Sequence, residues 1–280
     1  MGTIASLFGY VLNFLYNIVQ NYGLAIIIFT VLLKIVLLPL SIKQQKAMKK
    51  SSEIQEKLNK LQVKYKSDPQ MLNQKTMELY KTENVSPFLG CLTTIIQLVI
   101  IISVFNLVSR PLTYMKKVDP ETIKNYTAEL TENGEKSNYP EIRIIESKSS
   151  EDDKVSINMN FLGLDLSKVP MQNYKDIKVF IIPALYVLIT FINIKLTSNM
   201  NKKKKDDESN TKLVENSKKN DDEEDSETEM ESIQSMTNSM NMMVPIMSVA
   251  IALIAPLGLS LYWLVSNILQ LLERWILKSV

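Results

Sequence analysis

Histidine is absent from this sequence of 280 residues, and cysteine occurs only once, at Cys91. Without histidine there can be no His-based metal site, no histidine general base and no Ser–His catalytic pair. A single cysteine excludes an intramolecular disulfide and any CxxC motif. The chain therefore lacks the residues on which most enzymatic and metal-binding sites depend, and we expect no catalytic residue, metal or cofactor.

Acidic residues are absent from the first 52 positions, whereas residues 201–231 contain almost no apolar side chain. Averaged over the chain, the composition is 46% hydrophobic and 22% charged, as in soluble proteins, and the net charge of +2 favours no class of partner. The averages conceal a strong segregation of apolar from charged residues along the chain. This segregation is typical of membrane-spanning helices joined by polar loops.

Five apolar stretches are long enough to cross a bilayer as helices, which takes about 20 residues each. Buried helices of a soluble protein are the alternative, but no soluble core needs five such runs. We therefore expect an all-α integral membrane protein with five transmembrane helices. The predicted spans are residues 21–42, 87–110, 177–197, 238–256 and 257–277.

Residues 1–20 have a different pattern, with apolar residues at steps of three and four from Ile4 to Val19. Polar side chains such as Ser6, Asn13 and Asn17 fall between them. The pattern predicts an amphipathic helix that lies at the external membrane surface, and a sixth span is the main alternative. A signal peptide is not expected, since no basic segment precedes the apolar run and no cleavage site follows it.

Lysine and arginine near the span ends predict the orientation of the chain. Segment 43–84 has ten lysines against five acidic residues, Lys202–Lys205 follow the third span, and Arg274 and Lys278 end the fifth. The N-terminus is therefore expected outside. Residues 43–86, 198–237 and 278–280 are then cytoplasmic, and the loop 111–176 is external.

The two long cytoplasmic segments differ in pattern. Residues 43–86 are predicted to form a helical hairpin, in which Asp68 caps the second helix and Pro69 is its first residue. Residues 198–237 are rich in charge and without periodicity, which predicts a disordered linker. In the external loop, Ile142–Ile145 are expected to form a short strand. The Lys202–Lys205 run is interpreted as a topology signal, and no specific nucleic-acid site is expected.

Polar residues inside the predicted spans are the candidates for function. Lys34 lies nine residues from Lys43, or about 13 Å along a helix, close to the membrane midplane. A charge at this depth costs about 3 kcal/mol or more and marks a candidate site. No acidic residue is expected deep in a span, so Lys34 is predicted to have no countercharge and to need water. The other candidate residues are Thr30, Thr94, Gln97, Thr190, Asn193, Trp263, Asn267 and Gln270.

Two interpretations of these polar residues stay open from the pattern alone. They form hydrogen bonds between helices, worth about 1 kcal/mol each, or they line a wet groove that accepts polar segments of another polypeptide. Methionines at Met240, Met243 and Met247 likewise suit either core packing or an adaptable apolar surface for client helices. A channel or transporter for small solutes or ions is the competing functional class, although no inverted repeat is visible.

Four sequence blocks resemble the YidC/Oxa/Alb family of membrane protein insertases in its short, five-span form. They are NYGLAIIIFTVLLKIVLLPLSIKQQ (21–45), KYKSDPQMLNQKTMELYKTENVSPFLGCLTTIIQ (64–97), FLGLDLSK (161–168) and PLGLSLYWLVSNILQ (256–270). The blocks occur in the family's order and cover well over half of the chain. The family's groove usually contains an arginine, and the matching position here is Lys34.

The resemblance implies a membrane protein insertase and chaperone of the bacterial cell membrane, which catalyses no covalent reaction. Its hydrophilic groove would contain Lys34, Gln97 and the polar stripe of the last span, and the 43–86 hairpin would receive clients. The implied partners are nascent membrane proteins and the lipid bilayer. The Sec translocon and the ribosome are further candidate partners.

Overall fold

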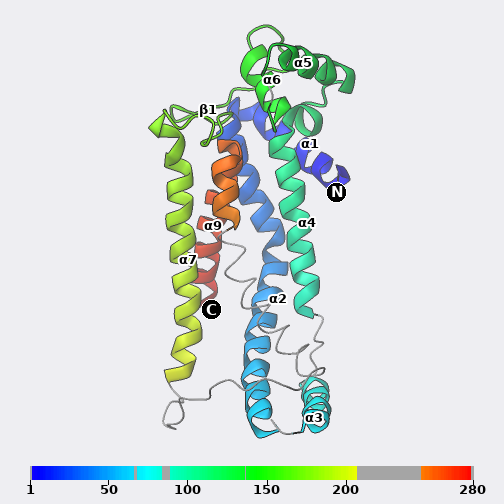
Figure 1. The fold of residues 1–280 in the computed structure, drawn as a ribbon, viewed down its shortest axis with the longest axis vertical. Coiled ribbons are helices and arrows are strands. Elements are labelled where there is room, and N and C mark those ends of the chain that lie inside the picture. Colours follow the sequence, from blue (N-terminus) through cyan, green and yellow to red (C-terminus); the bar gives the residue numbers. More distant parts are fainter. Residues whose placement is uncertain (1, 66–67, 84–88, 136, 207–246, 279–280) are drawn as a thin grey trace. The chain divides into compact units, whose positions relative to one another are not determined.

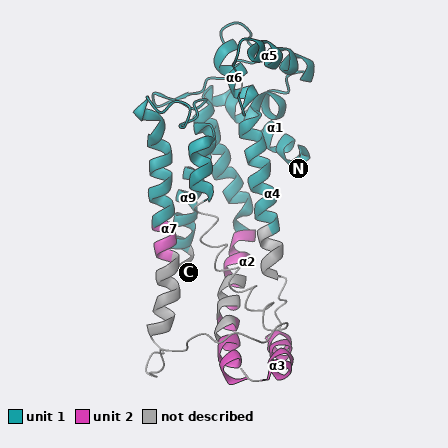
Figure 2. Ribbon diagram, viewed as in Figure 1, with its two compact units in different colours: residues 1–39, 94–191, 247–280 teal, residues 40–93, 192–246 magenta. Residues whose placement is uncertain are grey.

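The computed structural model describes residues 2–65, 68–83, 89–135, 137–206 and 247–278, which are almost entirely helical (Figure 1). The chain divides into two compact units (Figure 2). Unit 1 comprises residues 1–39, 94–191 and 247–280, and unit 2 comprises residues 40–93 and 192–246. The prediction of a predominantly helical chain is confirmed.

Unit 1 is a bundle of long apolar helices (Figure 2). A bilayer offers no water to unpaired peptide groups, so apolar segments of this length satisfy their backbone hydrogen bonds internally as helices. The helices that contribute are α1 (Gly2–Val19), the first part of α2 (Tyr22–Lys64), most of α4 (Leu89–Ser109), the first part of α7 (Ile181–Asp206), a helical stretch over 247–254, and α9 (Leu257–Lys278).

The five predicted spans are not confirmed as a set. Within the described ranges, three helical segments are long and apolar enough to cross a membrane: Gly2–Val19, Tyr22–Lys46 and Ile177–Leu196. A shorter apolar helical segment, Ile95–Ser109, lies within the predicted second span. Most of the predicted fourth span, 238–256, lies outside the described residues.

Helix α1 differs from the simple amphipathic helix that the sequence predicts. One face is buried in the core of unit 1, through Ala5, Leu12, Leu15 and Tyr16. A second apolar face is exposed, and its residues are Leu7, Tyr10, Phe14 and Ile18. With protein on one side and exposed apolar side chains on the other, the helix suits contact with lipid. Its length and composition also allow it to cross a bilayer.

Gly9 lets α1 approach the π-helical turn η1 (Leu112–Lys116) very closely. A Cβ atom added at Gly9 would lie 1.8 Å from the carbonyl oxygen of Tyr114, which belongs to the backbone and cannot move aside as a side chain can. The close approach therefore depends on the absence of a side chain at this position.

Gly9→Ala is expected to lower the free energy of unfolding by about 2 kcal/mol, as overpacked core substitutions do. The matched control is Gly2→Ala on the same helix, where the added methyl would lie at an ordinary 3.7 Å from the Tyr114 hydroxyl. Thermal unfolding of both variants in detergent checks the prediction. Equal midpoints for the two variants would show that α1 is not closely packed on η1.

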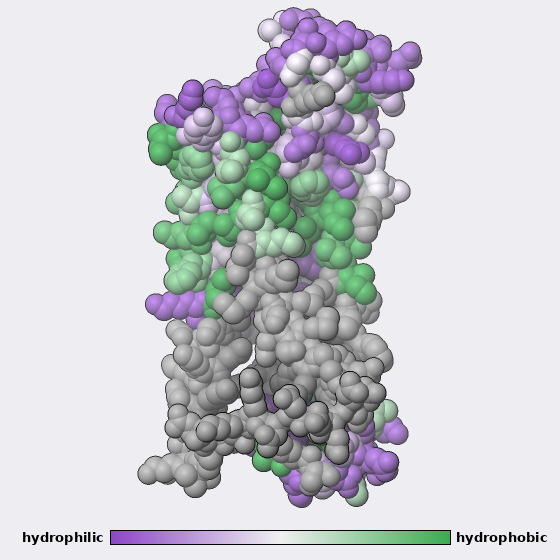
Figure 3. Space-filling view, viewed as in Figure 1, coloured by the Kyte–Doolittle hydropathy of each residue, from purple (hydrophilic) through white to green (hydrophobic). Residues whose placement is uncertain are grey.

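A polar cap (residues 112–176) closes one end of unit 1, where Figure 3 shows hydrophilic side chains beyond a band of apolar ones. Its elements are η1, α5 (Pro120–Glu132), α6 (Pro140–Lys148) and a two-residue hairpin of β1 (Asn160–Phe161) and β2 (Leu164–Asp165). The predicted strand at Ile142–Ile145 is wrong, because these residues lie in α6. Proline at the first position of α6 and burial of three of its isoleucines favour the helix.

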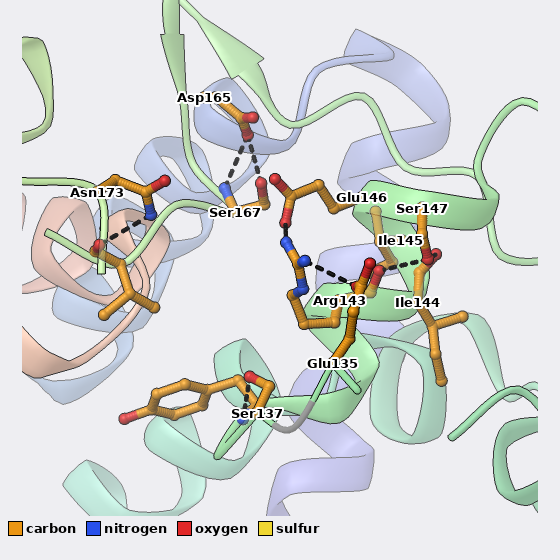
Figure 4. Close-up of polar contacts among 12 residues, drawn as sticks. Glu135, Ser137, Arg143, Ile144, Ile145, Glu146, Ser147, Asp165, Ser167 and Asn173 are labelled. Atoms are coloured by element: carbon orange, nitrogen blue, oxygen red, sulfur yellow. Dashed lines mark hydrogen bonds and ion pairs between the residues drawn. The ribbon is translucent and has the colours of Figure 1, made fainter. Parts of the chain in front are cut away.

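Charged side chains hold the cap together (Figure 4). Arg143 lies between Glu135 and Glu146 and pairs with both. The buried Glu141 carboxylate accepts hydrogen bonds from the Thr113 amide at 2.9 Å and from its hydroxyl at 2.6 Å. Burial nevertheless raises the pKa of Glu141 above its ordinary value. The cap is thus an ordered part of unit 1.

Unit 2 contains the second part of α2 and helix α3 (Pro69–Thr82). As predicted, Asp68 caps α3, and its side chain accepts a hydrogen bond from the Met71 amide at 3.0 Å. Ile54 and Leu58 are buried, and Lys57 pairs with Glu83 just after α3 and lowers the pKa of that carboxyl. The predicted linker is described only as far as Asp206.

Candidate functional site

Lys34 has a countercharge, contrary to the expectation from the sequence. Its Nζ atom lies 3.9 Å from Oε2 of Glu273 on α9, within unit 1. The Glu273 side chain is 7% exposed, whereas that of Lys34 is 28% exposed. Glu273 lies near the end of the predicted span 257–277, and the prediction that Lys34 has no countercharge is wrong.

The surface around Lys34 combines charge with exposed apolar side chains. Ile35 follows it directly on α2 and is 60% exposed, and Leu38, one turn further along the same face of the helix, is 41% exposed. In a membrane such side chains would face lipid or another apolar segment. A partly accessible cation beside them makes a surface that can contact a polypeptide with both apolar and polar parts.

Thr30, another of the candidate site residues, is buried in the structure. Thr30 is only 1% exposed, and its hydroxyl donates a hydrogen bond of 2.6 Å to the Ile26 carbonyl one turn earlier. This back-bonding satisfies the hydroxyl within its own helix. Thr30 therefore contributes to the core of unit 1 in this structure.

Helices α7 and α9 meet along a seam that unites three of the predicted site residues. The Asn267 amide donates a hydrogen bond to the Thr190 hydroxyl at 3.0 Å. One turn along each helix, the rings of Trp263 and Tyr186 lie 5.9 Å apart. The pairs have matching spacing of four residues, so both lie on the facing sides of the helices. At this seam the polar residues Thr190 and Asn267 form a hydrogen bond between helices, the first of the two interpretations that the sequence left open.

A double-mutant cycle with Thr190→Val and Asn267→Leu is expected to give a coupling free energy of about 1 kcal/mol, as for other hydrogen bonds between membrane helices. Each single variant leaves one polar group in the seam without this partner, so the double variant should lose less than the sum of the two. Unfolding in detergent measures all four species. Strict additivity would mean that the hydrogen bond contributes nothing to the packing of α7 on α9.

The remaining predicted residues lie in different surroundings. Gln97 is exposed on α4, between the exposed Ile95 and Leu98, and Gln270 is half-buried on α9. Asn193 is buried and belongs to unit 2. Met247 is exposed. The Thr94 side chain, Met240 and Met243 lie outside the described part of the structure.

Residues 158–171 of the cap form a connecting segment that was not predicted from the sequence. At one end, the Tyr22 amide donates to the Asn158 carbonyl at 3.0 Å, and the Asn158 amide donates to the Tyr16 hydroxyl at 2.8 Å. At the other end, the Leu257 and Gly258 amides donate to the carbonyls of Lys168 and Leu166. These contacts join the start of α2 and the start of α9 to one segment. Three of the four sequence blocks quoted above therefore meet here, but residue spacing gives no signal of it.

Long apolar helices, polar contacts between them and a polar cap define the class of the protein: an integral, multi-pass, helical membrane protein. A profile of the 60Kd inner membrane protein family matches residues 14–280. The chain therefore belongs to this family, the YidC/Oxa/Alb family that its sequence resembles. That resemblance is confirmed.

Individual relatives agree with this assignment. The chain is 46% identical over 107 residues to the membrane protein insertase YidC of Caldanaerobacter subterraneus subsp. tengcongensis. The matched region covers 38% of this chain and 52% of the relative. It is 48% identical over 96 residues to the YidC of Fusobacterium nucleatum, covering 34% and 47%. The chain thus spans about half the length of these curated relatives.

Proposed function

We propose that this protein is a membrane protein insertase and chaperone, which inserts nascent membrane proteins into the bilayer and catalyses no covalent reaction. The observation that carries the proposal is the Lys34–Glu273 pair beside exposed apolar side chains of α2. Membership of the family and the names of the relatives support it.

The proposed mechanism follows from the cost of moving polar groups through hydrocarbon. A short polar segment of a client would cross the membrane beside Lys34 and Gln97, where a cation and an amide replace part of its hydration. The client's apolar segment would stay against the exposed side chains of α2 and α4, and then leave sideways into lipid. The protein would thereby lower the barrier to translocation of the polar segment.

The proposed topology places the polar cap outside and unit 2 in the cytoplasm, as the lysine distribution predicts. Clients would then reach the α2–α3 hairpin of unit 2 first, and the nascent chain would be its partner. Single cysteines introduced at residues 60 and 130, in a Cys91→Ser background, test the orientation. Residue 60 should react with an impermeant thiol reagent only after the membrane is opened, and residue 130 without opening.

Photocrosslinking of a stalled client tests the function directly. A photoreactive amino acid at position 97 should crosslink to a stalled nascent chain with one apolar segment. The matched control is the same amino acid at position 125, which is also exposed but lies on α5 in the cap. Crosslinks at position 97 and none at position 125 are expected. Equal yields, or none at position 97, would contradict an insertion site next to Gln97.

A further inference from the structure

The Lys34–Glu273 pair is asymmetric in a way that bears on which clients it accepts. Glu273 is almost fully buried, whereas more than a quarter of the Lys34 side chain is accessible. Any group that enters from the surface therefore meets the cation first. The carboxylate lies behind it and lowers the positive potential that such a group experiences.

The pair is also loose. Its 3.9 Å separation exceeds the 2.7–2.9 Å that is usual for a hydrogen bond between an ammonium and a carboxylate. The attraction is therefore a charge interaction without a tight hydrogen bond. An ammonium has three donors and rotates freely, so Lys34 can turn towards a second carboxylate without first breaking a bidentate contact.

We propose that Glu273 is a specificity-determining residue, an internal counter-ion that a client's carboxylate displaces from Lys34. The inference rests on the proposed insertase function and concerns how the Lys34 site selects among clients. In the resting state Glu273 neutralises Lys34, so the site accepts uncharged segments. An acidic segment competes with Glu273 for the cation, and a basic segment meets less repulsion than an unpaired lysine would exert.

Charge complementarity of this kind changes selectivity more than it changes total affinity, because it acts on the difference between clients. Arg274, the next residue on α9, adds a second positive charge near Glu273, so the three groups together carry a net positive charge that the carboxylate of Glu273 reduces. Removing that carboxylate should therefore make the site strongly selective for acidic segments.

The test compares three clients that differ only in a translocated tail, which is acidic, uncharged or basic. In membranes with matched amounts of protein, Glu273→Gln is expected to raise the ratio of acidic to basic insertion about tenfold, the effect of one close charge. Glu273→Asp, which keeps the charge, is the matched control and should leave the ratio near that of the parent. Combining Lys34→Met with Glu273→Gln leaves Arg274 as the nearby charge and should bring the ratio back to about that of the parent.

A charge swap keeps the inference falsifiable if Glu273→Gln does not fold. Lys34→Glu combined with Glu273→Lys retains the pair but makes the accessible member negative, so the preference should reverse towards basic tails. An unchanged ratio in either variant overturns the inference. A parent protein that inserts even the uncharged-tail client confirms the insertase proposal independently, whereas failure of the parent with all three clients refutes that proposal and the inference together.

Discussion

Lys34→Met is expected to reduce insertion of clients with acidic translocated tails at least about tenfold, whereas Lys34→Arg should insert them as the parent does. A charge of opposite sign in a medium of low dielectric is worth several times the roughly 1.4 kcal/mol that corresponds to tenfold. Arginine keeps the charge at a similar reach, although it changes the hydrogen-bonding geometry. The measurement is insertion into membranes at matched protein abundance.

Clients with uncharged tails provide the internal control for this experiment. These clients gain little from the cation, so Lys34→Met should reduce their insertion by less than about threefold. A uniform loss for all clients would indicate a folding defect. Full insertion of acidic-tailed clients by Lys34→Met would show that the charge is not the working element, and Lys34 would then be a residue that only extends towards polar surroundings.

The presence of Glu273 changes the expected effect of Lys34→Met on the stability of the protein. An unpaired lysine would be costly to bury, so its removal by itself would be neutral or stabilising. With Glu273 buried next to it, the substitution removes the positive charge that lies 3.9 Å from the carboxylate. Breaking a buried pair in this way is destabilising, and partial exposure of Lys34 reduces the effect to about 1–2 kcal/mol. The double variant with Glu273→Gln should recover most of this loss.

The helices could be predicted from the sequence because apolar length and local capping decide them. Asp68 and Pro69 at the start of α3 are a local signal, and the structure has the cap. The predicted strand at Ile142–Ile145 failed for the opposite reason. Runs of isoleucine favour strands in isolation, but Pro140 at the start of α6 and burial against the cap outweigh that local preference.

The site was predictable only in part. The distance from Lys34 to Lys43 makes Lys34 a candidate site residue, but its partner Glu273 lies more than two hundred residues away on α9. Which turn of one helix faces which turn of another depends on the packing of the whole bundle, and residue spacing contains no such information. For the same reason, the sequence nominated Thr190 and Asn267 separately and did not show that they bond to each other.

The hairpin of unit 2 is organised enough to have a function of its own. Ile54 and Leu58 are 3% and 6% exposed, Asp68 caps α3, and Lys57 pairs with Glu83. Ten lysines between residues 43 and 84 give it a positive charge next to the predicted membrane surface. In the proposed topology this ordered, basic element lies on the cytoplasmic side, where it would be suited to receive clients before they enter the membrane.

Replacing residues 48–80 with a short Gly/Ser linker is therefore expected to reduce insertion of every client at least about tenfold while unit 1 stays folded, because nearly all of the core residues belong to unit 1. Shortening residues 205–230 should preserve insertion, since their composition predicts no packed structure. Helicity and thermal unfolding of unit 1 check that the spans survive the replacement.

A point substitution separates the packing of the hairpin from its mere presence. Leu58→Ala removes a buried side chain and should cost about 2–4 kcal/mol of local stability, so the hairpin opens and insertion falls. Asn73→Ala, an exposed position on α3, is the matched control and should leave both unchanged. Proteolytic protection of residues 43–84 and insertion are measured on the same membranes. If insertion stays complete when the hairpin is open or absent, clients reach the Lys34 site without it, and the receiving step belongs to another part of the protein.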